Sequence, residues 1–230
     1  MALPKHPETI VIKNKFYPRG LKEIDIWNYY QKVKKQILQE TFNRNLMFSI
    51  MVDVNQTIIR RKSKEGYIRL SPSNYDNIIT GRTVAIYPEM SAYENFGIID
   101  IDIDPSDGFK WAKKATFDVY NFVMDKMPLV TTATIKFTGK TSFHIICHFR
   151  NKMKIDTIRF LLRKFLQESE LSRVYTIEMK RRAGVPNLDL APNKFRGNYI
   201  ALNSLSILGL RCMEVPFSGL LSFDPRKAKI

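Results

Sequence analysis

Cysteine and histidine are scarce in this chain of 230 residues, which contains two cysteines and three histidines. Two thiols, Cys147 and Cys212, cannot build a disulfide framework or a four-thiolate zinc site, so we expect a reducing setting and no zinc. Long apolar runs are also missing. No stretch approaches the roughly 18 apolar residues that cross a bilayer, and the N-terminus lacks the apolar run of a signal peptide. The sequence therefore predicts a soluble, cytoplasmic protein with no membrane partner.

Acidic residues are outnumbered by basic ones, with 22 Asp and Glu against 37 Lys and Arg and a formal net charge of +15 at pH 7. Long-range attraction then favours anionic partners, and nucleic acid is the first of these. A Lys-rich proteome would give the same composition, so charge alone does not decide the function. The hydrophobic content of 44% is sufficient for the core of one large domain or two small ones.

Hydrophobic periodicity divides the chain into helices and strands. Apolar residues at three- and four-residue spacing predict helices, the first of them with a basic outer side, and alternating or β-branched runs predict strands. The expected helices are 23–41, 109–127 and 155–168. The expected strands are 46–54, 56–61, 82–87, 96–103, 130–137, 143–149, 175–180, 187–190 and 199–201, followed by a tail of loop and strand character over 209–223.

The arrangement of these elements predicts a single α+β domain that spans residues 1–230, because no repeat, low-complexity tract or linker divides the chain. Residues up to about 85 would form an N-terminal supporting subregion. Residues from about 86 to 230 would form the sheet that carries the chemistry.

Three aspartates alternate with isoleucine in the segment 98–105, Ile-Ile-Asp-Ile-Asp-Ile-Asp-Pro. Successive side chains of a strand point to opposite faces, so Asp100, Asp102 and Asp104 share one face. Three like charges repel one another, and Mg²⁺ or Mn²⁺, which prefer oxygen ligands, would compensate them. The alternative is a solvated polar face. The all-isoleucine opposite face and the end of the strand at Pro105 favour a two-metal site that activates a 3′-hydroxyl.

A second polar segment, 136–144 (Lys-Phe-Thr-Gly-Lys-Thr-Ser-Phe-His), joins two of the predicted strands. Backbone N–H groups of a glycine turn, hydroxyls and a lysine make a suitable cradle for a triphosphate, and a following histidine can bond a phosphate or sugar oxygen. The segment lacks the glycine and lysine order of a P-loop. A polar hairpin turn with an incidental histidine stays open as the alternative. The candidate nucleotide-binding residues are Thr138, Gly139, Lys140, Ser142 and His144.

Asp189 is a lone carboxylate between Leu188 and Leu190, with basic residues close behind it. The charge run 178–182 (Glu-Met-Lys-Arg-Arg) lies upstream. Such a run is more often a solvated surface than a binding site, although it could contact template phosphates.

Taken in order, the Asp-x-Asp strand, the Gly- and Lys-containing turn that ends in hydroxyl-x-His, and the hydrophobic-Asp strand resemble the three motifs of the archaeo-eukaryotic primase superfamily. They are most similar to the polymerase domain of ligase D, the primase-polymerase of non-homologous end joining. Its first motif, Asp-Leu-Asp-Pro-Gly before a Trp and a helix, resembles Asp102-Ile-Asp-Pro-Ser-Asp-Gly-Phe-Lys-Trp111. The resemblance implies a primase-type α+β fold with a mixed or antiparallel, RRM-like sheet, flanking helices and an N-terminal α/β subregion.

The same resemblance implies roles for single residues. Asp102 and Asp104 would be the catalytic metal pair, Asp189 the third catalytic metal ligand, and Asp100 an extra carboxylate outside the pair. The nucleotide's phosphates and sugar would be held by Thr138, Lys140, Ser142 and His144, and Asn193 follows Asp189 by four residues as in the third motif.

The likeness reaches both ends of the chain and has two departures. Phe16-Tyr-Pro18 and Tyr29-Tyr30 resemble the Phe-Pro and Tyr-Tyr of ligase D polymerases, and the tail over 204–210 and 221–225 resembles the primase small subunit. Tyr87 stands about where those polymerases have a His. Ser206 and Leu208 stand where they have phosphate-binding arginines, for which Arg196 and Arg211 are the candidate replacements.

The resemblance implies a template-directed, Mn²⁺- or Mg²⁺-dependent nucleotidyltransferase that adds NTPs or dNTPs to a nucleic-acid 3′ end in end joining or gap filling. Its partners would be a DNA template and primer or broken DNA ends, nucleoside triphosphates, a DNA ligase and other end-joining proteins. Two alternatives remain open. One is a replicative-type primase that makes primers de novo, and the other is a nucleic-acid-binding subunit of the same fold with weak or no catalysis.

Overall fold

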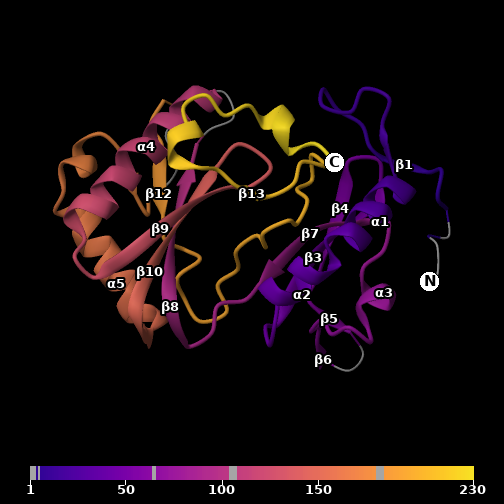
Figure 1. Cartoon of the computed structure of the whole chain (residues 1–230), viewed down its shortest axis with the longest axis horizontal. Helices are drawn as coiled ribbons and strands as arrows, with labels where there is room; N and C mark the ends of the chain where they lie inside the picture. Colours follow the sequence, from indigo (N-terminus) through magenta and orange to yellow (C-terminus); the bar gives the residue numbers. More distant parts are fainter. Residues whose placement is uncertain (1–3, 5, 64–65, 104–107, 180–183) are drawn as a thin grey trace. The chain divides into compact units, whose positions relative to one another are not determined.

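The computed structural model describes residues 4, 6–63, 66–103, 108–179 and 184–230, which form an α+β fold in two compact units (Figure 1). The first unit consists of Met1–Glu89, Asn198–Met213 and Asp224–Ile230, and the second of Met90–Gly197 and Glu214–Phe223. The first boundary lies close to the division expected near residue 85, but two C-terminal segments rejoin the first unit. The single-domain organisation stays a prediction.

The first unit contains small antiparallel sheets. Its strands are β1 (Ile10–Ile12), β2 (Leu21–Lys22), β3 (Leu46–Asp53), β4 (Gln56–Arg60), β5 (Lys62–Ser63), β6 (Gly66–Tyr67) and β7 (Thr83–Pro88). Its helices are α1 (Glu23–Lys32), α2 (Lys34–Glu40), α3 (Tyr75–Ile78) and the 3-10 helix η4 (Pro225–Ala228). The three-stranded sheet has the order β4-β3-β7, and β1 pairs with β2 and β5 with β6. Of the helices in the described residues, none combines the length and hydropathy needed to cross a membrane.

Tyr30 ties the first unit together from the buried side of α1. Its hydroxyl donates to the carbonyl of Val84 at 3.0 Å and accepts from the N–H of Leu205 at 3.1 Å. The hydroxyl of Tyr75 donates to the carbonyl of Tyr30 at 2.9 Å. Buried polar groups need such partners, so these bonds fix α1, α3, β7 and the returning segment 198–213 around one core.

The helix expected over 23–41 is two helices, α1 and α2, which meet at Val33. Val33 has φ −100° and ψ 10°, outside the helical range. Hydrogen bonds of helical spacing still cross this point, from the Val33 N–H to Tyr29 and from the Ile37 N–H to Val33, at 3.1 and 3.0 Å. The break is therefore a local distortion at one residue between the two helices.

The strand expected over 199–201 is wrong, although the segment runs beside β7. The N–H groups of Tyr199 and Ala201 donate to the carbonyls of Pro88 and Ile86. In a regular antiparallel ladder the N–H of Ile86 would donate back to the backbone of this segment. It donates instead to the Ser204 hydroxyl at 2.8 Å. This side-chain bond replaces the second half of the ladder, so the described segment has a single isolated bridge, between Glu89 and Asn198.

The second unit is built on a six-stranded sheet of order β11-β12-β8-β10-β9-β13. Its strands are β8 (Tyr93–Asp102), β9 (Val130–Phe137), β10 (Phe143–Lys154), β11 (Thr176–Ile177), β12 (Asn187–Asp189) and β13 (Met213–Glu214), the last of which begins in the first unit. Its helices are α4 (Phe109–Lys126), α5 (Ile155–Gln167) and the 3-10 helices η2 (Glu170–Arg173) and η3 (Phe217–Gly219). Apart from η2 and β11, which lie between α5 and β12, the elements β8, α4, β9, β10, α5 and β12 follow one another as β-α-β-β-α-β.

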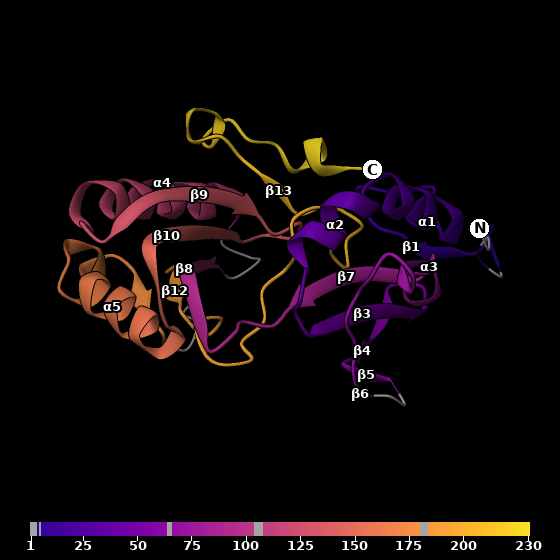
Figure 2. The same cartoon turned by 60° about the horizontal axis from the view of Figure 1, so that its bottom comes forward.

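Both long helices of the second unit cover the same face of this sheet, as Figure 2 shows. Phe109 at the start of α4 packs its ring on Phe137 and Phe143, at centroid distances of 5.7 and 5.3 Å. On β8, a Cβ at Gly97 would meet Ile158 and Leu162 of α5. Successive side chains of a strand point to opposite faces, so those at positions 98, 100 and 102 of β8 lie on the face that neither α4 nor α5 covers.

Strong periodicity gave accurate bounds for three elements of this unit, whereas β8 begins three residues before the expected strand 96–103 and β10 extends five residues beyond the expected strand 143–149. The strand expected over 130–137 coincides with β9, and the helices expected over 109–127 and 155–168 differ from α4 and α5 by one residue at the C-terminal end. The strand expected over 175–180 is shortened to β11, because Glu178 adopts φ 51°, which ends an extended strand. The α+β class is confirmed, and the RRM-like sheet and N-terminal subregion stay predictions.

Candidate functional site

Four charged or ionisable side chains form a row across the sheet of the second unit, on the face opposite α4 and α5. Asp189 of β12 lies opposite Asp100 of β8, and Asp100 lies opposite His144 of β10. His144 in turn lies opposite Lys136 of β9. Directly opposed residues of antiparallel strands share a face. Strand pairing thus brings together two of the sequence-predicted acids and the predicted histidine.

Asp102 lies two residues along β8 from Asp100, on the same face, and opposite Asn187 of β12. Its predicted partner, Asp104, lies outside the described residues, so the pairing of Asp102 with Asp104 stays a prediction. Asp100, which the motif register left outside the pair, is the second member of the row, between Asp189 and His144. Within the described part of the chain, no group of three or more His, Cys, Asp and Glu side chains is close enough to hold a metal ion.

His144 is buried and neutral at physiological pH. Burial lowers the pKa of its imidazole well below the usual value, and the positive charge of Lys136 lowers it further. The Nε2 atom lies 3.7 Å from Oδ1 of Asp100, which is beyond hydrogen-bond range. A neutral ring at this distance forms no ion pair with Asp100. The Nδ1 atom is buried and has no hydrogen-bond partner among the described residues, so the ring retains hydrogen-bonding capacity.

Lys136 is the functional candidate that sequence reasoning missed as a site residue. Its side chain is 1% exposed, although lysine is almost never buried to this degree. No local signal marks it, because Lys136 continues the polar positions Thr132 and Thr134, which alternate with the apolar positions of β9. A buried cation at this position places a positive charge at the end of the row that is farthest from Asp189.

The turn between β9 and β10 is closed by its own hydroxyl groups. The Thr138 N–H and hydroxyl both donate to the Ser142 carbonyl, at 3.1 and 3.0 Å, and the two hydroxyls lie 2.8 Å apart. Gly139 has φ 84°, a left-handed conformation that strains other residues. Lys140 follows it and is exposed. The turn is therefore a defined structure that presents one lysine to solvent.

Asn193 is fully buried and is bonded to the backbone of β8. Its Oδ1 accepts from the N–H of Ile98 at 2.7 Å, and its Nδ2 donates to the carbonyls of Ile98 and Leu190. Both polar atoms of this amide hold the strand that carries Asp100 and Asp102. The geometry thus gives Asn193 a positioning role, and direct contact with a nucleotide stays a prediction that its burial does not favour.

The two other polar candidates near the end of β12 are more accessible. Oδ1 of Asp189 accepts from the Ala191 N–H at 2.8 Å, which fixes the orientation of the carboxylate. Arg196 is exposed, has φ 62°, and places its guanidinium 5.5 Å from the centroid of the Phe195 ring.

The positions that depart from the family pattern have local structural roles in the first unit. Tyr87 packs against a buried cluster that includes Ala85, and burial raises the pKa of its hydroxyl. Ser206 forms a tight turn, in which its hydroxyl accepts from the Leu208 N–H at 3.1 Å and its carbonyl accepts from the Gly209 N–H at 2.9 Å.

A comparison with solved structures shows which known fold this architecture is similar to. The polymerase domain from Mycobacterium tuberculosis ligase D, solved in complex with DNA, matches it with a TM-score of 0.79 over 98% of this chain and 89% of that one. The chain has the fold of a ligase D polymerase domain. Sequence identity between the two is 13%, so the likeness establishes the fold alone. Neither a family model nor a curated protein matches the chain by sequence. The resemblance seen in the motifs is thereby confirmed at the level of the fold.

Proposed function

We propose that the chain is a template-directed, divalent-metal-dependent nucleotidyltransferase that adds NTPs or dNTPs to the 3′ end of a nucleic-acid strand. The observation that carries this proposal is the row of Asp189, Asp100, His144 and Lys136 on one face of the sheet, with Asp102 beside it. The fold likeness to a polymerase domain solved with DNA supports it.

The donor set suits a hard divalent cation. Asp100, Asp102 and Asp189 offer carboxylate oxygens on one face, and Asp104 is the fourth candidate. In phosphoryl transfer Mg²⁺ is usually held by one or two carboxylates together with oxygens of the substrate phosphates. When bound, Mg²⁺ or Mn²⁺ would activate the 3′-hydroxyl and offset the charge of the triphosphate.

The remaining residues of the row act on the incoming nucleotide. Lys136 and Lys140 supply positive charge for the triphosphate, and the neutral ring of His144 can donate a hydrogen bond to a phosphate or sugar oxygen. Thr138 and Ser142 hold the turn from which Lys140 projects. The chain's own contribution is then to orient the triphosphate for in-line attack.

In this role the partners are a primer and template or broken DNA ends, nucleoside triphosphates, and a DNA ligase that seals the product. The reaction would belong to end joining or gap filling in the cytoplasm.

Replacing Asp102 by Asn tests the proposal. Incorporation of labelled nucleotide on a gapped or overhanging duplex with Mn²⁺ should fall by about 100-fold or more, because a metal ligand loses its charge. Asp125→Asn is the matched control, since Asp125 is an exposed carboxylate on α4, and it should leave incorporation unchanged. Incorporation that persists when both Asp102 and Asp104 are replaced by Ala would refute the assignment.

The same assay identifies the second member of the carboxylate pair. If Asp100→Asn abolishes incorporation and Asp104→Asn does not, the pair is Asp100 and Asp102. The reverse result supports the pair read from the sequence, Asp102 and Asp104. Reactions without primer distinguish primer extension from primer synthesis.

A binding-only subunit is the second candidate, and the turn at Ser206 favours it because arginines are expected there. Calorimetry separates the two proposals. A protein that binds DNA but binds no nucleoside triphosphate in the presence of Mn²⁺ would be the binding-only subunit.

A further inference from the structure

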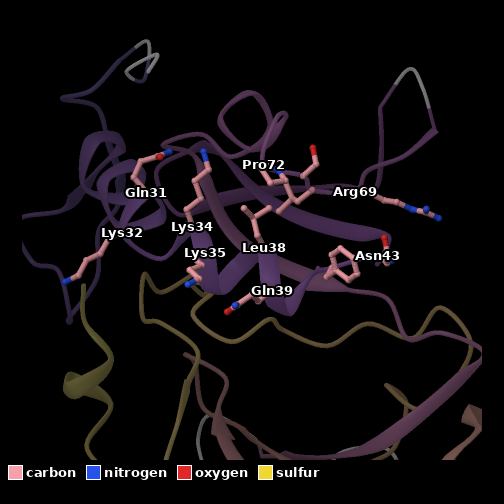
Figure 3. Close-up of a pocket in the computed structure, with 12 residues that line it drawn as sticks. Gln31, Lys32, Lys34, Lys35, Leu38, Gln39, Asn43, Arg69 and Pro72 are labelled. Atoms are coloured by element: carbon pink, nitrogen blue, oxygen red, sulfur yellow. The ribbon is translucent and has the colours of Figure 1, made fainter.

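The first unit has an open pocket beside α2, lined by residues of 31–43 and 69–72, which we call the α2 pocket. Its volume is about 960 Å³, at the upper end of the range for sites that bind small molecules. Figure 3 shows Leu38 and Pro72 between Lys34 on one side and Arg69 on the other. The pocket thus has an apolar middle and basic flanks, and it belongs to neither the sheet row nor the predicted motifs.

Helical spacing on α2 creates two parallel stripes in this pocket. Lys34 and Leu38 are four residues apart on α2, so they line one stripe, and Phe42 follows just beyond the end of the helix. Lys35 and Gln39 begin the second stripe. The pocket therefore presents apolar, cationic and amide groups at short intervals along one surface.

Phe42 is held outward by the end of the helix. The hydroxyl of the buried residue Thr41 donates to the Ile37 carbonyl at 2.7 Å, and Asn43 adopts φ 54°, which reverses the chain. Asparagine tolerates this left-handed conformation better than most residues. As a result the Phe42 side chain is 72% exposed at the edge of the pocket, where an aromatic ring would normally be buried.

The charged residues that line the pocket are all cationic. Its lining includes four cations and no Asp or Glu. Lys34 is committed to Asp76, with an ion pair at 3.0 Å, whereas Lys35 and Arg69 form no ion pair within the described residues. Nε of Arg69 donates to Oδ1 of Asn45 at 2.9 Å, which fixes its orientation. The pocket therefore attracts an anion.

We propose that the α2 pocket binds a single-stranded segment of nucleic acid, an assignment that rests on the proposed function because it extends the substrate beyond the duplex. A base stacks on the exposed ring of Phe42, and the flanking phosphates lie against Lys35 and Arg69. Proteins that bind single strands combine an aromatic platform with a cationic surface in this way. Amide side chains such as Gln39 and Asn43 can bond the exposed edges of unpaired bases.

An acidic helical peptide is the other occupant that a basic pocket admits. Grooves that take such a helix present a row of apolar anchors. Among the residues that line this pocket, Leu38, Phe42 and Pro72 offer accessible apolar surface, whereas Leu70 is 8% exposed. Cations and amides together make up seven of the twelve lining residues. This composition favours nucleic acid.

Fluorescence anisotropy tests the proposal with a labelled single-stranded 15-mer and a blunt duplex of the same sequence. Phe42→Ala should weaken binding of the single strand by about 5- to 150-fold, the range that stacking one base accounts for, and leave binding of the duplex unchanged. Phe160→Ala is the matched control, because Phe160 is 60% exposed on α5 of the other unit. Replacing Lys35 and Arg69 by Gln should reduce the salt slope for the single strand by about 0.7 per cation.

Unchanged binding of the single strand by Phe42→Ala and by the double Gln variant would overturn the proposal. Equal losses for single strand and duplex would also overturn it, because they indicate general charge attraction. A third overturning result is an acidic helical peptide whose binding depends on Phe42 while that of the single strand does not. Asp102→Asn, which removes the proposed activity, should bind the single strand normally, so the two proposals fail separately.

Discussion

Burial and neighbouring charge set the state of single residues on the sheet face. His144 lies between Asp100 and Lys136 in the pairing register, and burial together with the Lys136 charge lowers the pKa of its ring. A neutral imidazole can donate one hydrogen bond and accept another. The neutral state of the His144 ring thus follows from its position in the sheet and could not be read from the motif.

Glu178 follows β11 and lies between two arginines of α5. It accepts hydrogen bonds from Arg159 and Arg163, and its side chain is 12% exposed. Burial alone would raise the pKa of Glu178, but the hydrogen bonds from Arg163 and Arg159 lower it below its ordinary value of 4.5. The ionised form is therefore the one that the folded state stabilises.

Replacing Glu178 by Gln should lower the free energy of unfolding by about 1 kcal/mol at pH 7, because two partly exposed arginines lose a charged acceptor. A carboxylate with a depressed pKa in the folded state stabilises above its unfolded pKa, and this contribution is lost as pH falls through the folded pKa. Urea denaturation at pH 7 and below pH 4.5 should thus show a difference between wild type and variant that shrinks on acidification. A difference that stays constant with pH would contradict this reading.

At the scale of elements, the contact between β8 and α5 depends on a residue without a side chain. A Cβ at Gly97 would lie 2.5 Å from Cγ2 of Ile158 and 2.8 Å from Cδ1 of Leu162. Both distances are shorter than van der Waals contact. α5 can therefore approach the sheet closely at this point, and β8 is held against it.

Gly97→Ala should lower the free energy of unfolding by about 1–3 kcal/mol, the usual effect of overpacking a core. Chemical denaturation of the two proteins measures it. Gly219→Ala is the control, because a Cβ at Gly219 meets nothing within 4 Å, and it should change stability little. An equal effect of both substitutions would show that loss of glycine flexibility, and not the contact with α5, is responsible.

Local patterns in the sequence predicted the elements that satisfy their own periodicity. The expected bounds of β9 and α4 were correct to within one residue. Each element has apolar residues at the spacing of its own secondary structure, and this apolar face must be buried. The strand expected over 199–201 was wrong, since the hydrogen bond from the Ile86 N–H to the Ser204 hydroxyl joins residues 118 apart. Such a long-range bond has no local signal.

The residue types of the candidate site could be predicted from the sequence, but which of them lie opposite one another in the sheet could not. The aspartates and the histidine were identified from their motifs, but the motif register gave no reason to place Asp100 between Asp189 and His144. Its position depends on the alignment of β8 with β10 and β12, which is a property of the folded sheet. Lys136 was passed over because a lysine in a strand usually faces solvent.

At the scale of the whole molecule, the net charge of +15 agrees with a role that brings the chain to a polyanion. The fold likeness to a polymerase domain solved with DNA provides a structural context for that charge. Two compact units contribute to it, and each carries part of the basic surface, such as Lys35 in the first and Lys140 in the second.

Affinity for a blunt duplex should fall steeply with salt. If the chain contacts 6–10 phosphates, the affinity should drop by about 10³-fold or more between 50 and 200 mM salt, because each contact releases a condensed counterion. Anisotropy titrations over this range give the slope of log K against log salt concentration, and a neutral osmolyte at matched osmolarity serves as control. A flat slope would mean that the charge is not used for binding DNA.

The two hydrogen bonds between Asn193 and Ile98 also help to hold β8 in its register. A slip of one residue along β10 or β12 would turn Asp100 and Asp102 toward α4 and α5 and turn Ile99 and Ile101 away from them. In the observed alignment the amide of Asn193 bonds both the N–H and the carbonyl of Ile98. This buried side chain therefore stabilises the alignment that keeps the two acids on the face away from α4 and α5.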